Sequence, residues 1–203
     1  MAQSTRTFLA VDVPQTVAER LIKLQTKLAT QAPAFRWTVP PPFHLTLAFL
    51  GDVPYTDLNE VCEAAARAAR SCKRFELRVA GLGAFPRPEK PRVAWAGLDG
   101  PGLESLAALH KTLLANLRRI GRPPEDIRFT PHITLGRLGG PRGKAPQPTV
   151  DLTEVLAAHR EWTAGAFSVG ELVAYSSTLT PEGPTYAPLS RTHLASAKSR
   201  TET

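Results

Sequence analysis

Two stretches of this chain repeat one pattern: Pro-Phe-His-Leu-Thr-Leu-Ala-Phe-Leu-Gly at residues 42–51 and Thr-Pro-His-Ile-Thr-Leu-Gly-Arg at residues 130–137. Each begins with a proline-containing turn and then reads histidine, an aliphatic residue, threonine and leucine. Side chains alternate between the two faces of a β-strand. Each stretch therefore predicts a strand with an imidazole and a hydroxyl on one face, from His44 and Thr46 or from His132 and Thr134, and aliphatic side chains on the other.

A third His-x-Thr sequence runs from His110 to Thr112. It lies in a stretch with helical periodicity, where residues two apart do not face each other. We therefore expect His110 to be a surface residue of an amphipathic helix that takes no part in the repeated pattern.

The elements predicted around the two histidine strands also repeat. The order strand, helix, histidine strand, helix, strand is predicted in residues 6–80 and again in residues 91–190, with a turn-rich junction at 81–91. We expect one α+β domain over residues 1–191. It would be a bilobal duplicated fold, with two pseudo-symmetric lobes of sheet and helix around a central cleft. The polar segment 192–203 is expected to be a disordered tail.

The composition is that of a globular protein, with 203 residues of which 42% are hydrophobic. No apolar run is long enough to span a bilayer, and the first residues lack a long apolar region. Cys62 and Cys72 match neither a disulfide framework nor a zinc-ligand pattern. We expect a cytoplasmic monomer with no membrane association and no cofactor. The net charge of +7 suits a polyanionic partner such as RNA, and equally suits a solvated basic surface.

Two facing histidine strands offer a specific chemistry. Displacement at phosphorus is in line, so the attacking and leaving oxygens lie on opposite sides of the phosphate. One group must take a proton on one side and another must give a proton on the other, and an imidazole with a pKa of about 6.5 can do either. Threonine hydroxyls can donate to the non-bridging oxygens. Such a site needs no metal.

Other interpretations of the same residues remain open. The histidines could be hydrogen-bonded core residues, and the threonines could be present only as good strand formers. A metal site is disfavoured because no acidic residue, cysteine or further histidine lies near either histidine at a recurring ligand spacing.

The paired motifs resemble the 2H phosphoesterase superfamily, and they are most similar to the bacterial and archaeal RNA 2′,3′-cyclic phosphodiesterases, also called 2′-5′ RNA ligases or LigT-like proteins. The resemblance extends from about residue 6 to residue 189. It includes the flanking sequences Arg-Thr-Phe-Leu-Ala-Val-Asp-Val-Pro at 6–14, Phe-Arg-Trp at 35–37, Tyr-Ser-Ser at 175–177 and Gly-Pro-Thr-Tyr at 183–186. Many relatives have a lysine or arginine in place of Ala48. The resemblance implies a bilobal α+β fold with a V-shaped cleft, and hydrolysis of RNA 2′,3′-cyclic phosphate ends to 2′-phosphomonoesters.

The resemblance also implies a role for each motif residue. His44 would be the proton donor to the leaving 3′ oxygen, and His132 the proton acceptor that activates water. Thr46 and Thr134 would bind phosphate oxygens with help from Arg137. Simple alternation places Arg137 on the face opposite His132, so this role requires a bulge, which Gly136 would permit.

Contacts with a base and with the RNA chain are less defined. Aromatic side chains stack on unpaired bases, and the candidates are Phe8, Trp37, Phe49 and Tyr186, of which we expect one or two to contact substrate. The basic loop 139–148 is a candidate for backbone contact. Three further hypotheses stay open: a non-catalytic RNA-binding protein, an enzyme for small cyclic phosphates or 2′-5′ oligonucleotides, and 2′-5′ ligation as the reverse reaction.

Overall fold

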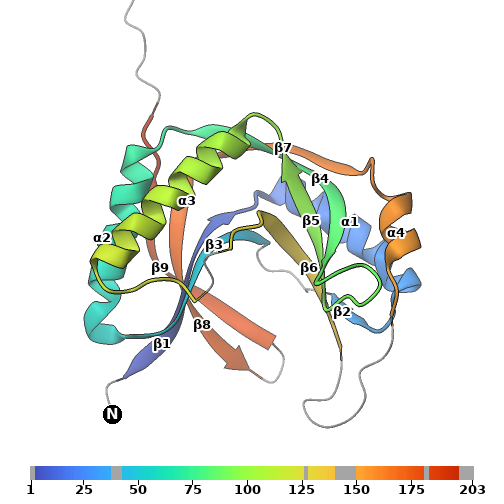
Figure 1. Cartoon of the computed structure of the whole chain (residues 1–203), viewed down its shortest axis with the longest axis horizontal. Helices are drawn as coiled ribbons and strands as arrows, with labels where there is room; N and C mark the ends of the chain where they lie inside the picture. The colour runs from blue at the N-terminus through green and yellow to red at the C-terminus, as the bar shows by residue number, and fades with distance from the viewer. Residues whose placement is uncertain (1–2, 38–42, 126–127, 140–149, 181–182, 197–203) are drawn as a thin grey trace, which may run out of the picture.

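The computed structural model describes residues 3–37, 43–125, 128–139, 150–180 and 183–196. Within these residues one antiparallel sheet curls through the molecule, and four α-helices cover one of its faces (Figure 1). The strands are β1 (Ser4–Asp12), β2 (Phe35–Trp37), β3 (His44–Pro54), β4 (Phe75–Phe85), β5 (Val93–Asp99), β6 (His132–Leu138), β7 (Thr163–Val169), β8 (Glu171–Thr180) and β9 (Gly183–His193). The helices are α1 (Gln15–Gln31), the short 3-10 helix η1 (Tyr55–Asp57), α2 (Leu58–Ser71), α3 (Gly102–Arg119) and α4 (Thr153–Ala158).

A narrow seam joins two halves of this sheet. The strand order is β7-β4-β5-β6-β3-β1-β8-β9, with β2 also paired to β6. At the centre, β3 and β6 share the single residue pair Leu45 and Ile133, both of which are fully buried. In the half-sheet that contains β3, α2 packs against β8 and β9. In the half-sheet that contains β6, α1 packs against β7 and β2, and α4 packs against side chains of β2, β4 and β5. α3 packs beside α2 and also contacts β4 and β5. The predicted α+β class and its two-lobed sheet are therefore confirmed.

The two lobes do not coincide with the two halves of the sequence. β4 belongs to the first half of the chain, yet it lies between β5 and β7 of the second half. Conversely, β8 and β9 from the end of the chain extend the sheet beside β1. Each lobe of the sheet thus contains strands from both halves of the chain.

The structure extends two strands beyond their expected ends. β4 continues to Phe85, so the junction expected at 81–91 is a strand over its first residues. β9 continues to His193, Leu194 is 3% exposed, and the amide of Ala195 donates to the Cys72 carbonyl at 2.9 Å. Pairing with β8 and burial of Leu194 hold this segment in place, so the boundary expected after residue 191 lies within β9. Residues 197–203 lie outside the described residues.

The expectation that His110 is a surface residue is wrong. Its side chain is only 9% exposed, and its ring stacks on Phe129 with the centroids 3.9 Å apart. Burial lowers the pKa of His110, and a hydrogen bond with the backbone of Leu47 partly opposes that shift. The helix expected around His110 is present as α3, but β3 and Phe129 cover the face that carries His110, which local periodicity does not reveal.

No helix in the described ranges is both long and apolar enough to cross a membrane.

Leu45→Ala tests the contribution of the seam to stability. Leu45 is 0% exposed, and removing its side chain leaves a cavity where the lobes meet. We expect the free energy of unfolding to fall by about 2–5 kcal/mol, measured by urea denaturation. Leu179→Ala is the matched control, because Leu179 is 55% exposed on β8 and its truncation should change stability by less than about 0.5 kcal/mol. Equal losses in the two variants would contradict this account of the seam.

Candidate active site

The two histidine strands present their polar side chains to the same face of the sheet. Along β3 and β6 the histidine and threonine are partly exposed, and the aliphatic residues between and after them are buried, as predicted. Continuing the register of the Leu45–Ile133 pair sets each histidine beside the threonine of the other motif. Diagonal neighbours in such a ladder lie about 7–8 Å apart. The register therefore places the two imidazoles on one face of the sheet, on either side of the Leu45–Ile133 pair.

Each histidine strand has a β-bulge directly after its threonine. In the β1–β3 ladder, Ala10 pairs with Thr46 and Leu9 with Ala48, so Leu47 has no partner in that ladder. In the β5–β6 ladder, Trp95 pairs with Thr134 and Ala94 with Gly136, so Leu135 is the residue left over.

The bulges reset the alternation of side chains. Without them, the fifth residue after each histidine would point to the opposite face. With them, Phe49 and Arg137 lie on the histidine face, and both are exposed. The bulge required for Arg137 to reach the site is therefore present, and Phe49 is its counterpart in the first motif.

Buried polar side chains from two helices contact the bulged residues. Gln25 on α1 is 6% exposed and donates from Nε2 to the Leu135 carbonyl at 2.6 Å. His110 on α3 is hydrogen-bonded with the backbone of Leu47. These contacts satisfy backbone groups that the ladder leaves unpaired. Sequence reasoning missed both residues, although a glutamine beside the apolar stripe Leu21, Leu24 and Leu28 of α1 was a detectable signal.

His132 lies in an environment that favours the neutral imidazole. Its Nδ1 is 2.8 Å from the Thr130 carbonyl, which can only accept, so Nδ1 carries the hydrogen and Nε2 keeps its lone pair. Burial lowers the pKa of His132, a hydrogen bond with Thr130 partly raises it, and the charge of Arg137 lowers it further. The ring also packs edge-on against Phe85, with the centroids 5.0 Å apart.

The side chain of His44 packs against aromatic rings. The centroid of Phe8 is 5.0 Å from the His44 ring, and Tyr186 meets that ring edge-on at 5.3 Å. Phe8 is itself stacked on Tyr175 at 5.3 Å. The imidazole of His44 therefore rests on a packed cluster that connects β1, β8 and β9.

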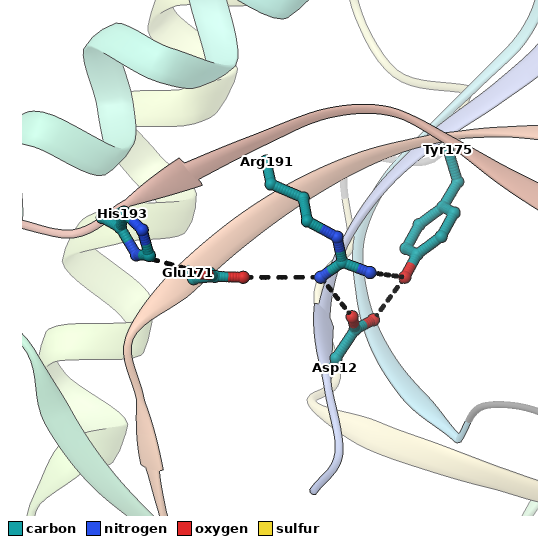
Figure 2. Close-up of polar contacts among 5 residues, drawn as sticks. All are labelled: Asp12, Glu171, Tyr175, Arg191 and His193. Atoms are coloured by element: carbon teal, nitrogen blue, oxygen red, sulfur yellow. Dashed lines mark hydrogen bonds and ion pairs between the residues drawn. The ribbon is translucent and has the colours of Figure 1, made fainter.

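An ionic network holds the hydroxyl of Tyr175, one of the residues of this cluster (Figure 2). Asp12, the strand partner of His44, accepts hydrogen bonds from the Tyr175 hydroxyl at 2.7 Å and from Arg191 at 2.9 Å. Arg191 also contacts Glu171 at 3.4 Å. Burial and the bond to Asp12 raise the pKa of Tyr175 to about 12. The residue paired with His132 is Gly97, so the second motif has no carboxylate at this place.

The four aromatic candidates occupy different environments. Phe8 is 2% exposed and supports His44, so it has no open face for a base. Trp37 packs on Phe35 at 5.5 Å within the core, on the face opposite the histidines. Phe49 is 46% exposed beside Phe8, and Tyr186 is partly exposed beside His44. Phe49 and Tyr186 are the two candidates that remain for contact with a base.

Two further expectations concern the basic loop and metal binding. Apart from Gly139, the basic loop at 139–148 lies outside the described residues. Within the described ranges, no three His, Cys, Asp or Glu side chains are grouped so that they could hold a metal ion.

Comparison with known proteins agrees with this architecture. The family described as LigT-like phosphoesterase matches residues 11–95 and 97–186. A Methanothermobacter thermautotrophicus protein named RNA 2′,3′-cyclic phosphodiesterase is 31% identical over 89% of this chain and 94% of its own length, and a Thermotoga maritima protein of the same name is 33% identical over 89% and 91%.

Solved structures show the same likeness. The crystal structure of TT0787 from Thermus thermophilus has a TM-score of 0.73 and 31% identity, covering 94% of this chain and 98% of that one. Escherichia coli LigT in complex with 3′-AMP has a TM-score of 0.73 and 28% identity, covering 95% and 99%. The chain therefore belongs to the LigT-like phosphoesterase family.

Proposed function

We propose that this protein hydrolyses the 2′,3′-cyclic phosphate at RNA ends to a 2′-phosphomonoester, with His44 as the proton donor and His132 as the proton acceptor. The Leu45–Ile133 pair is the observation that most supports this proposal, because it joins the two His–Thr strands at the residues that lie between each histidine and its threonine. The shared name of the curated relatives and the 3′-AMP complex of Escherichia coli LigT support RNA ends as the substrate.

The proposed reaction uses one imidazole on each side of the phosphate. Nε2 of His132 takes a proton from water as the water oxygen attacks phosphorus, and the bond from phosphorus to the 3′ oxygen breaks. His44 gives its proton to that leaving oxygen, so the 2′ ester bond remains. Proton exchange with solvent then restores the neutral His132 and the charged His44.

Three further side chains stabilise the charge on the phosphate. The hydroxyls of Thr46 and Thr134 donate to the non-bridging oxygens, and Arg137, returned to this face by the bulge, neutralises the charge that develops there. All the groups used are side chains of the protein, so the proposed reaction is independent of metal. The same groups acting in reverse would join RNA ends through a 2′-5′ bond. We also propose that the protein acts as a monomer in the cytoplasm.

His44→Ala and His132→Ala test the two catalytic roles. Each removes one proton-transfer group, and we expect kcat to fall by about 10²–10⁴-fold. The assay separates 2′- from 3′-phosphate products of a short RNA with a 2′,3′-cyclic end, in the presence of a chelator. His159→Ala is the control, because His159 lies at the end of α4, outside the site. Turnover that requires added divalent metal, or RNA binding without turnover in the parent protein, would contradict the proposal.

The acidic limb of the pH–rate profile tests His132 as the base. The base must be neutral, and the pKa of His132 is lowered from 6.5, so kcat/KM should stay high until the pH falls below that value. Arg137→Gln removes one cause of the lowering, so the midpoint of the limb should move to higher pH while the rate falls. A midpoint that stays in place or moves lower would count against His132 as the base beside Arg137.

Phe49→Ala tests contact with the terminal base. Stacking of a base on an aromatic ring is worth about 1–3 kcal/mol, so we expect KM to rise roughly 5- to 100-fold with a smaller change in kcat. Tyr55→Ala is the matched control, because Tyr55 is an equally open aromatic residue, 53% exposed, in η1. Similar kinetics for the two variants would exclude Phe49 as a base contact.

A further inference from the structure

Two arginines stand directly opposite each other on neighbouring strands at one end of the site. Arg36 on β2 pairs with Arg137 on β6, and both side chains are exposed. The residues on either side of Arg36, Phe35 and Trp37, pack into the core, so alternation places Arg36 on the opposite face. That is the face to which the bulge returns Arg137. The two guanidinium groups therefore project from the same face, on strands about 4.8 Å apart.

This pairing is unfavourable in the protein alone. Like charges directly opposite each other in an antiparallel ladder are destabilising. Neither guanidinium forms an ion pair with a carboxylate within the described ranges, where the ion pairs involve other residues. An arrangement that costs stability and has no carboxylate partner among the described residues suits an anionic ligand.

The backbone gives Arg36 a defined place. The Gly139 amide donates to the Ala34 carbonyl at 2.8 Å, which brings Gly139 beside the arginine. A Cβ on Gly139 would lie 3.1 Å from Cγ and 3.3 Å from Nε of Arg36. The aliphatic part of the Arg36 side chain therefore lies against Gly139. A larger residue at position 139 would crowd this side chain.

The position of the arginine pair relative to the histidines indicates which anion it would bind. β2 and β3 pair with β6 one after the other, β3 at Ile133 and β2 at residues 136–138, so Arg36 and His44 lie beside β6 on the same edge. Arg137 lies three residues beyond Thr134, which is roughly 10 Å of strand. The charge of Arg137 lowers the pKa of both His132 and Tyr186, so Arg137 acts on groups of the site. Arg36 lies opposite Arg137, at the same distance along β6 from the histidines.

We propose that Arg36 binds the next phosphodiester of the RNA, the one on the 5′ side of the terminal nucleotide. This inference rests on the proposed function, and it makes the preferred substrate an oligonucleotide with a cyclic end rather than a cyclic mononucleotide. Arg36 is then a specificity residue that contacts substrate outside the reacting phosphate.

Three substrates test this site in the parent protein and in Arg36→Gln. They are a nucleoside 2′,3′-cyclic monophosphate, a dinucleotide with the same cyclic end, and that dinucleotide with an uncharged methylphosphonate linkage. We expect Arg36→Gln to lower kcat/KM for the charged dinucleotide by about tenfold or more, as loss of a charge-assisted hydrogen bond does. The other two substrates should change by less than about twofold. Arg119→Gln, an equal change of charge on the exposed end of α3, is the control.

A stability measurement separates this role from a structural one. Relief of the repulsion with Arg137 should leave the urea midpoint of unliganded Arg36→Gln equal to or above that of the parent protein. A lowered midpoint, an equal loss on all three substrates, or no loss on any of them would overturn the proposal.

A binding measurement separates failure of this inference from failure of the proposed function. If the parent protein hydrolyses none of the substrates, the proposed function fails, and calorimetric binding of a dinucleotide with a 3′-phosphate then decides the Arg36 site. Weaker binding by Arg36→Gln than by Arg119→Gln supports the site, and equal binding overturns it.

Discussion

The β-bulge after each threonine is the constraint on which the rest of the site depends. It carries Arg137 and Phe49 from the core face to the histidine face, so one strand supplies an imidazole, a hydroxyl and a further contact group to the same point. A bulge leaves backbone groups unpaired, and these are costly when buried. Gln25 on α1 offsets this cost by donating to the carbonyl of Leu135, and His110 on α3 does so through its hydrogen bond with the backbone of Leu47. The two helices thus fix the local geometry of the strands as well as covering the core.

The duplicated motif produces two unequal histidines, because the surrounding residues differ. His132 is partly buried and lies near the cation Arg137, and both features lower its pKa and favour a neutral base. Its Nδ1 donates to the Thr130 carbonyl, which partly opposes that shift but leaves Nε2 as the atom that can accept a proton. His44 lies beside Asp12, which is held by Tyr175 and Arg191. At the corresponding place beside His132 there is Gly97, which has no side chain. These different neighbours support the proposed division into acid and base, in addition to the family resemblance.

The arginines around the site differ in their carboxylate partners among the described residues. Arg36 and Arg137 are direct partners on the neighbouring strands β2 and β6. Among the described residues, neither forms an ion pair with a carboxylate. In contrast, Arg191 at the other side of the site contacts two carboxylates. An arginine with carboxylate partners in the chain holds the fold, and an arginine without them is available to a ligand.

The sequence alone determined the α+β class and the placement of each histidine on the same strand face as its threonine, because these follow from side-chain periodicity within single segments. It also indicated that Arg137 would need a bulge. Only the tertiary structure decided that Phe8 and Trp37 are covered, that His110 is buried and that Arg36 faces Arg137. It also revealed that the lobes exchange strands and that β9 extends to His193. Each of these depends on which segments pack together across long separations in the chain, and local periodicity carries no information about that choice.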